Sequence, residues 1–147
     1  MAQLKRAEKR FRLTTRDYAR LAAFRHALRK FLRFSEDAAQ AVGLTGQHYQ
    51  AMLVVRGWPD DAHVTIADLA RQLLIRHNSA VELVDRLVEE DLLTRGMSPK
   101  DRRKVELRLT ARGRDVLAKL AAMHRSELQK IGPVLERFFA ELSRPER

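Results

Sequence analysis

The sequence contains no cysteine, and it has only six glycines and 6% aromatic residues. Without thiols there can be no disulfide framework, no thiolate metal site and no cysteine redox switch. The five histidines, at positions 26, 48, 63, 77 and 124, show no paired metal-ligand spacing, so we expect no metal. There is no phosphate-cradling glycine loop and no Gly-x-Ser-x-Gly elbow, so we expect neither a cofactor nor catalysis.

Long apolar runs are also missing. The longest, Ala51 to Val55, is far below the roughly 18 residues that a membrane span requires, and no signal-peptide core follows the charged N-terminus. We therefore expect a cytoplasmic protein without membrane association. A length of 147 residues is typical of a single domain.

Acidic residues are scarce relative to basic ones. Lysine and arginine number 29 against 19 acidic residues, for a formal net charge of +10. Such an excess favours a polyanionic partner, and both nucleic acid and an anionic membrane surface would satisfy it. Residues 1–13 carry five basic side chains and one acidic one, and we interpret them as a mobile arm or a helix extension.

Apolar residues at helical intervals predict three helices before residue 75. The first is expected over about 15–42, the second over 47–56 after an N-cap at Thr45, and a short third one after an N-cap at Thr65. A fourth helix should follow after a tight link. Its predicted buried stripe consists of Ala80, Val84, Leu87 and Val88.

The pattern then changes to that of a strand. Alternation over 105–109, preceded by turn residues, predicts a small hairpin that begins near Leu93. Thr110 caps the next helix, which Gly132 and Pro133 are expected to break before a last helix follows.

Two short helices with a tight link, followed by a hairpin, form the order of a winged helix-turn-helix. In that motif the second helix enters the major groove of DNA and the hairpin, or wing, reaches alongside. Residues 65–109 fit this order, and the segment 95–108 carries six basic and two acidic side chains. The predicted fold is mainly α with a small β-hairpin: a winged helix-turn-helix DNA-binding lobe plus a helical dimerisation domain formed from both termini.

Three motifs in this region resemble the MarR family of bacterial regulators: Leu83-Val84-Asp85-Arg86-Leu87, Asp101-Arg102-Arg103 and Leu109-Thr110-Ala111-Arg112-Gly113. The resemblance covers nearly the whole chain. It implies one MarR-like domain over 1–147, with a winged lobe over 45–110 and dimerisation helices over 1–42 and 111–147.

The resemblance also implies roles at the wing tip. Asp101 would orient an arginine there, and Arg103, with Arg102 beside it, would enter the minor groove, where a narrow A·T-rich groove attracts a guanidinium. The alternative for these arginines is a solvated basic turn. Family wings often carry a further acidic residue where Ser98 stands, and the start of the reading helix is not constant in the family, so an operator sequence cannot be transferred.

Base contacts are expected from the start of that reading helix. Amides pair with adenine, hydroxyls are versatile and carboxylates accept from cytosine N4, which favours Asn78, Ser79 and Glu82 over His77. The alternative is local, since Asn78 or Ser79 could cap the helix and Glu82 could pair with Arg86. The full set of expected DNA-contacting residues is Arg76, His77, Asn78, Ser79, Glu82, Arg95, Lys100, Asp101, Arg102 and Arg103.

Aromatic residues near both ends of the chain indicate subunit contact. Phe11, Phe31, Phe34, Phe138 and Phe139 are many for elements far from a small central core, and a partner would bury them. A two-fold dimer would place two reading helices about one DNA turn apart, on an inverted repeat.

MarR-like proteins commonly respond to small aromatic or phenolic anions where the dimer helices meet the DNA-binding lobe. The residues here that the resemblance places near such a ligand are Arg20, His48, Tyr49, Met52 and Trp58. The alternative is ordinary packing, because Tyr49 and Met52 have core-like spacing and Trp58 could pack a loop.

The sequence therefore indicates a sequence-specific, DNA-binding transcriptional regulator that acts as a homodimer. The resemblance implies a repressor that a small aromatic effector releases from its operator. The alternative is a nonspecific basic nucleic-acid-binding or architectural module without an effector, which the net charge alone would equally support.

Overall fold

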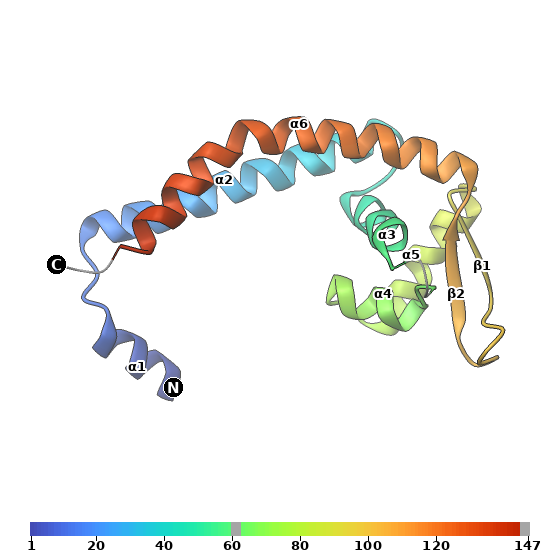
Figure 1. The fold of residues 1–147 in the computed structure, drawn as a ribbon, viewed down its shortest axis with the longest axis horizontal. Helices are drawn as coiled ribbons and strands as arrows, with labels where there is room; N and C mark the ends of the chain where they lie inside the picture. The colour runs from blue at the N-terminus through green and yellow to red at the C-terminus, as the bar shows by residue number, and fades with distance from the viewer. Residues whose placement is uncertain (60–62, 145–147) are drawn as a thin grey trace. The chain divides into compact units, whose positions relative to one another are not determined.

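The computed structural model describes residues 1–59 and 63–144 (Figure 1). In chain order the elements are α1 (Ala2–Arg10), α2 (Thr15–Gln40), α3 (Gly46–Gly57), α4 (Ile66–Leu73), α5 (His77–Glu89), β1 (Leu93–Met97), β2 (Val105–Leu109) and α6 (Ala111–Leu142). The described residues are thus mainly helical with one antiparallel two-stranded hairpin, which confirms the predicted fold class. None of the helices in these ranges is both long and apolar enough to cross a membrane.

The chain divides into two compact units. The first contains Met1–Arg33 and Glu127–Arg147, and the second contains Phe34–Ser126. The helices α2 and α6 each contribute residues to both units. The predicted winged lobe, 45–110, lies inside the second unit, whereas the boundaries predicted for the dimerisation regions stay predictions.

The core of the second unit lies among α3, α4, α5, the hairpin and the first part of α6. The alternation predicted over 105–109 is found at its second half, where Leu107 and Leu109 are buried and Arg108 is exposed, whereas Val105 and Glu106 are both half-buried. The backbone N–H of Leu107 also donates to the carbonyl of Val64 at 2.9 Å, which joins β2 to the segment before α4. The base of the hairpin is therefore anchored in the core.

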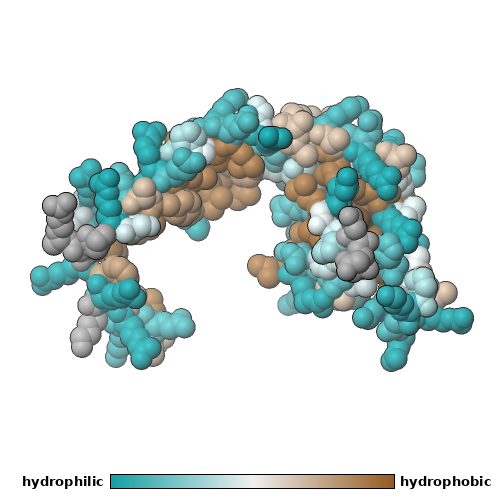
Figure 2. Space-filling model, in the orientation of Figure 1, coloured by the Kyte–Doolittle hydropathy of each residue, from teal (hydrophilic) through white to brown (hydrophobic). Residues whose placement is uncertain are grey.

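Aromatic side chains hold α2 and α6 together within the first unit. Phe24 stacks on Phe138 with ring centroids 4.7 Å apart, and Phe139 meets Phe24 edge-on at 5.8 Å. The Nε of Arg20 lies 2.9 Å from Glu141 Oε2. Several large apolar side chains of the unit, including that of Phe139, are exposed along these helices (Figure 2): Tyr18, Leu21, Leu28, Leu32, Leu128, Val134, Phe139 and Leu142.

Two expectations about helix ends are wrong. The helix α6 continues through Gly132 and Pro133, because proline removes only one backbone donor and the aromatic packing of Phe138 holds the helix beyond it. The carbonyl of Pro133 accepts from Arg137 Nε at 3.3 Å. Residues 2–10 form a helix of their own, α1, whose C-cap is Phe11, so they do not extend the helix that begins at Thr15.

Candidate nucleic-acid interface

The helix α4 begins at the predicted N-cap, Thr65, and the cap is reciprocal. Thr65 Oγ1 accepts the N–H of Asp68 at 3.1 Å, and Asp68 Oδ2 accepts the N–H of Thr65 at 3.0 Å. Burial raises the pKa of the Asp68 carboxyl, but hydrogen bonds from Thr65 and the charge of Arg71 outweigh burial, and the pKa is lowered overall. The C-cap of the helix is Leu74, whose left-handed backbone (φ 55°) turns the chain toward α5.

The helix α5 turns an exposed polar face away from the core. Its buried residues are Ala80, Leu83, Val84 and Leu87, so Leu83 is buried where Val88, only half-buried, was expected. The five residues of this region that were predicted to contact DNA are all exposed and lie at its N-terminal end: Arg76, His77, Asn78, Ser79 and Glu82.

The local alternatives for these polar residues are not found. The N-cap of α5 is Arg76, whose side chain makes no cap bond, so the capping roles considered for Asn78 and Ser79 are wrong. Among the described residues, Arg86 pairs at 3.3 Å with the carboxylate four residues further on, rather than with Glu82. The polar side chains at the start of α5 are therefore not engaged in the local contacts that the sequence allowed.

An ion pair ties the wing to α5. Arg95 on β1 pairs with Asp85 on α5, and both side chains are partly exposed. Exposed pairs of this kind contribute at most about 1 kcal/mol, so this one positions the two side chains more than it stabilises the fold. Arg95 thus has a partner within the chain, and its contact with DNA stays a prediction.

Short hydrogen bonds organise the wing tip between β1 and β2. Ser98, which is buried, accepts the backbone N–H of Lys100 at 3.3 Å through its hydroxyl. Asp101 Oδ1 accepts the backbone N–H of Arg103 at 3.0 Å and lies 3.6 Å from Arg103 Nε. The Arg103 side chain is 95% exposed, with Arg102 next to it. The structure therefore brings Asp101 and Arg103 together as the resemblance implies, whereas insertion into a groove stays a prediction.

Two further basic residues lie beside this site. Arg71 and Lys104 line a pocket of about 210 Å³ together with His77 and Arg103. The pocket joins α4, the start of α5 and the wing tip. The charge of the hairpin segment was a signal for Lys104, but Arg71 carries no local signal, because only folding brings α4 next to the wing.

Two of the five residues expected near an effector line separate pockets. Trp58 lines a pocket in the second unit, and Arg20 lines one in the first. Arg20 is engaged by Glu141 and also lies 3.7 Å from Asp17.

The other three expected effector residues have contacts within the second unit. Tyr49 is buried, its ring stacks on His124 at 4.0 Å, and burial raises the pKa of its hydroxyl. Met52 is fully buried. His48 Nδ1 accepts the N–H of Thr45 at 3.0 Å and completes the cap of α3. These contacts favour packing and capping roles for all three.

A helix-turn-helix followed by an anchored hairpin with a cationic tip defines a winged helix-turn-helix protein. A sequence model of the MarR family matches residues 42–104, so the resemblance to that family is confirmed for the central part of the chain. A search of curated proteins finds no match to the sequence.

Solved structures of MarR-family regulators share this fold. AbsC, a MarR family transcriptional regulator from Streptomyces coelicolor, is 22% identical, with a TM-score of 0.69 over 90% of this chain and 84% of that one. MepR of S. aureus in complex with DNA is 16% identical, with a TM-score of 0.69 over 83% and 92%. The transcriptional repressor CouR, bound to a 23-mer DNA duplex, is 24% identical, with a TM-score of 0.65 over 83% and 90%.

Proposed function

We propose that this chain is a MarR-type transcriptional regulator that binds an operator in duplex DNA as a homodimer and represses transcription. The observation that carries the proposal is the exposed polar start of α5 beside a cationic wing tip within one compact unit. Such a regulator works in the cytoplasm, where bacterial DNA lies. MepR and CouR, which share the fold, were solved with DNA.

The start of α5 suits both the backbone and the bases of DNA. The first N–H of the helix with an intrahelical acceptor is that of Ala80, which donates to the Arg76 carbonyl at 3.1 Å. The preceding N–H groups and the helix dipole favour a phosphate at this end. Asn78, Ser79 and Glu82 stand on the same exposed end with the donors and acceptors that base edges require.

The wing supplies the second contact. Because Asp101 holds the backbone of Arg103 and lies near its Nε, the guanidinium projects from a fixed base rather than from a loose turn. A guanidinium held in this way suits the narrow minor groove beside the reading helix. Lys100 and Arg102 extend the positive charge toward the phosphates.

Dimerisation through the first unit supports an inverted-repeat operator. The unit exposes large apolar side chains along α2 and α6, such as Leu28, Leu32 and Phe139. A second copy would remove them from water, and this burial is the main driving force of most protein association. A two-fold axis would then place two α5 helices on half-sites about one DNA turn apart.

Release by a small aromatic or phenolic anion is the regulation that the resemblance implies. Burial makes Tyr49 and Met52 poor candidates for direct contact, whereas Trp58 and Arg20 each line a pocket. The competing function, a nonspecific basic module, would need the positive charge but no ordered reading face. The polar side chains at the start of α5 are not used in the local contacts that the sequence allowed, which favours a sequence-specific regulator.

Selection of binding sites from random duplex DNA at near-physiological salt tests the proposal. An enriched inverted repeat with half-sites about one turn apart is the expected result. With this operator, Asn78→Ala should weaken specific binding and relax the preference at one base position. Gln129→Ala, which removes an exposed amide on α6, is the matched control. No enrichment over bulk DNA would establish the nonspecific module instead.

A further inference from the structure

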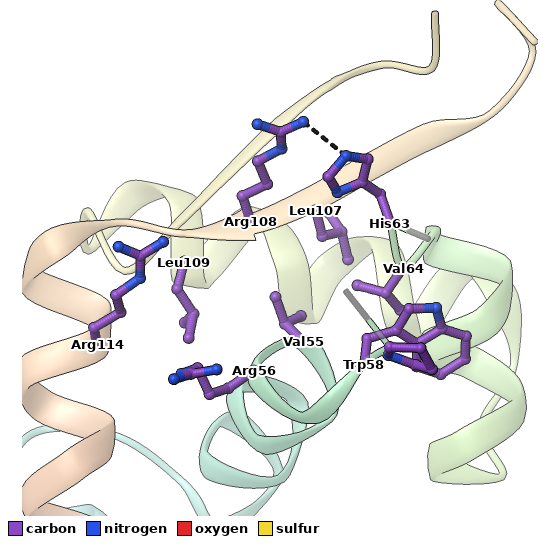
Figure 3. Close-up of a pocket in the computed structure, with 10 residues that line it drawn as sticks. Val55, Arg56, Trp58, His63, Val64, Leu107, Arg108, Leu109 and Arg114 are labelled. Atoms are coloured by element: carbon purple, nitrogen blue, oxygen red, sulfur yellow. Dashed lines mark hydrogen bonds between the residues drawn. The ribbon is translucent and has the colours of Figure 1, made fainter. Parts of the chain in front are cut away.

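A pocket in the second unit combines three guanidinium groups with an indole (Figure 3). It is an open hollow of about 400 Å³ among the end of α3, the residues that follow it, β2 and the start of α6. Its cationic lining comes from Arg56, Arg108 and Arg114, and Trp58 supplies an aromatic wall. This volume is within the range typical of small-molecule sites.

The charge of this pocket is one-sided. None of its ten lining residues is acidic, and no ion pair or hydrogen bond joins the side chain of Arg56 or Arg114 to another described residue. Arg108 donates to Nε2 of His63 at 2.9 Å, and this acceptor is a neutral nitrogen. The absence of acidic residues holds for the ten lining residues alone, because residues 60–62, which include two aspartates, lie outside the described ranges. Three guanidinium groups that share one hollow favour an anion of more than one charge.

The arrangement of these side chains also favours a ligand that contains a planar ring. Figure 3 shows Arg56 and Arg114 near Leu109 at one end of the pocket and Trp58 at the other. A planar ring can stack on the indole while an anionic group reaches the guanidinium groups in charge-assisted hydrogen bonds. We propose that this pocket binds a small aromatic dianion, of which an aryl phosphate is the simplest example.

This pocket adds a site to the proposed function. Of the residues expected near an effector, only Trp58 belongs to it. Because Arg108 lies on β2, which leads to the wing tip, the ligand would act on the wing side of the DNA interface. That regulatory consequence rests on the proposed function, whereas binding to the pocket does not.

Titration of the full chain with phenyl phosphate tests the site. Trp58 is the single tryptophan of the chain, so its fluorescence reports binding directly, and calorimetry gives the stoichiometry. We expect saturation at one ligand per chain. The affinity should be at least about tenfold higher than for inorganic phosphate, which lacks the ring, or benzyl alcohol, which lacks the charge.

Two variants on α6 distinguish the loss of a pocket residue from a general loss of positive charge. Arg114→Gln should weaken phenyl phosphate binding about tenfold or more, whereas Arg112→Gln, two residues earlier on the exposed surface of α6, should leave it unchanged. Arg56→Gln repeats the test if Arg114→Gln does not fold.

Several results would contradict the proposal that this pocket binds a small aromatic dianion. These are the absence of saturable binding at millimolar phenyl phosphate, equal binding of inorganic phosphate, and equal losses in the Arg112 and Arg114 variants. If Arg114→Gln weakens DNA binding and leaves phenyl phosphate binding unchanged, a DNA phosphate is the occupant and the proposal is also overturned. Site selection without ligand tests the regulator separately, so a chain that binds phenyl phosphate but enriches no operator keeps the pocket and loses only the proposed function.

Discussion

Gly113 lies where the start of α6 docks on the segment between α5 and β1, and replacing it with alanine should destabilise the fold. A Cβ at this position would lie 2.1 Å from the carbonyl oxygen of Leu92. That oxygen already accepts the N–H of Thr110 at 3.1 Å. The Thr110 hydroxyl in turn donates to the carbonyl of Asp91 at 2.6 Å and accepts the N–H of Gly113 at 2.9 Å. The start of α6 is thus fastened at the point where the methyl group would need space.

The size of the effect follows from this geometry. Because 2.1 Å is more than 1 Å short of an ordinary contact, which begins near 3.4 Å, the backbone must shift. Forced repacking costs about 1–3 kcal/mol, and weakening the hydrogen bonds of Thr110 adds about 0.5–1.5 kcal/mol for each bond. The better helix propensity of alanine returns up to about 1 kcal/mol. We expect Gly113→Ala to lower the free energy of unfolding by about 2–3 kcal/mol.

Urea unfolding followed by circular dichroism measures this loss, at one fixed protein concentration because dimerisation would make stability depend on it. Gly132→Ala is the matched control on the same helix, since, apart from its chain neighbours and the nearby backbone of its own helix, no described heavy atom lies within 4 Å of its added Cβ. It should raise stability by about 0.5–1 kcal/mol. If Gly113→Ala unfolds within about 0.5 kcal/mol of the parent chain, the close contact with Leu92 does not constrain α6 and the reasoning is refuted.

Three further predictions concern the wing, the turn and the cap of α3. Arg103→Ala should weaken operator binding about tenfold or more in a fluorescence anisotropy titration. An unchanged affinity would show that the wing tip does not contribute to the DNA interface. Leu74→Gly should raise the free energy of unfolding by about 1 kcal/mol, because the Leu74 side chain is 91% exposed and its backbone is left-handed; a loss of stability would contradict this. Burial, followed by the charge of Arg86, lowers the pKa of His48 in the folded chain. As the pH falls, the unfolded chain therefore binds a proton at His48 at a higher pH than the folded chain does. The stability from this cap is therefore complete above about pH 6.5 and lost as the pH falls below it, and His48→Gln should flatten the dependence seen in unfolding curves.

The beginnings of three helices could be predicted from the sequence because their signals are local. Thr45, Thr65 and Thr110 each bond to a backbone N–H three residues ahead, as expected of N-caps. The break expected at Pro133 did not occur, since a contact over more than a hundred residues, between Phe24 and Phe138, outweighs the local penalty. No window of sequence contains that contact.

The contacts of the candidate interface also divide into local ones, which the sequence predicts, and long-range ones, which it does not predict. Asp101 and Arg103 are two residues apart, so their contact could be predicted, and the charge of the hairpin marks the wing. The pairing of Arg95 with Asp85 and the approach of Arg71 to the wing tip depend on the fold, and no pattern signals them. Sequence reasoning therefore identifies the chemistry of the interface better than the positions of its side chains.

The start of α5 differs from the beginnings of α3 and α4 in a way that bears on function. The caps of α3 and α4 use a side chain to satisfy the first backbone donors, whereas Arg76 makes no such bond at α5. An uncapped beginning costs about 1 kcal/mol relative to a good cap, and the sequence has Asn78 and Ser79 close at hand without using them as caps. An exposed helix start with free donors and unused polar side chains gives up stability that a phosphate and base edges can restore. DNA that docks here would cap α5, so operator binding should protect the amides of His77, Asn78 and Ser79 from hydrogen exchange. Protection confined to the wing would show that α5 does not read the operator.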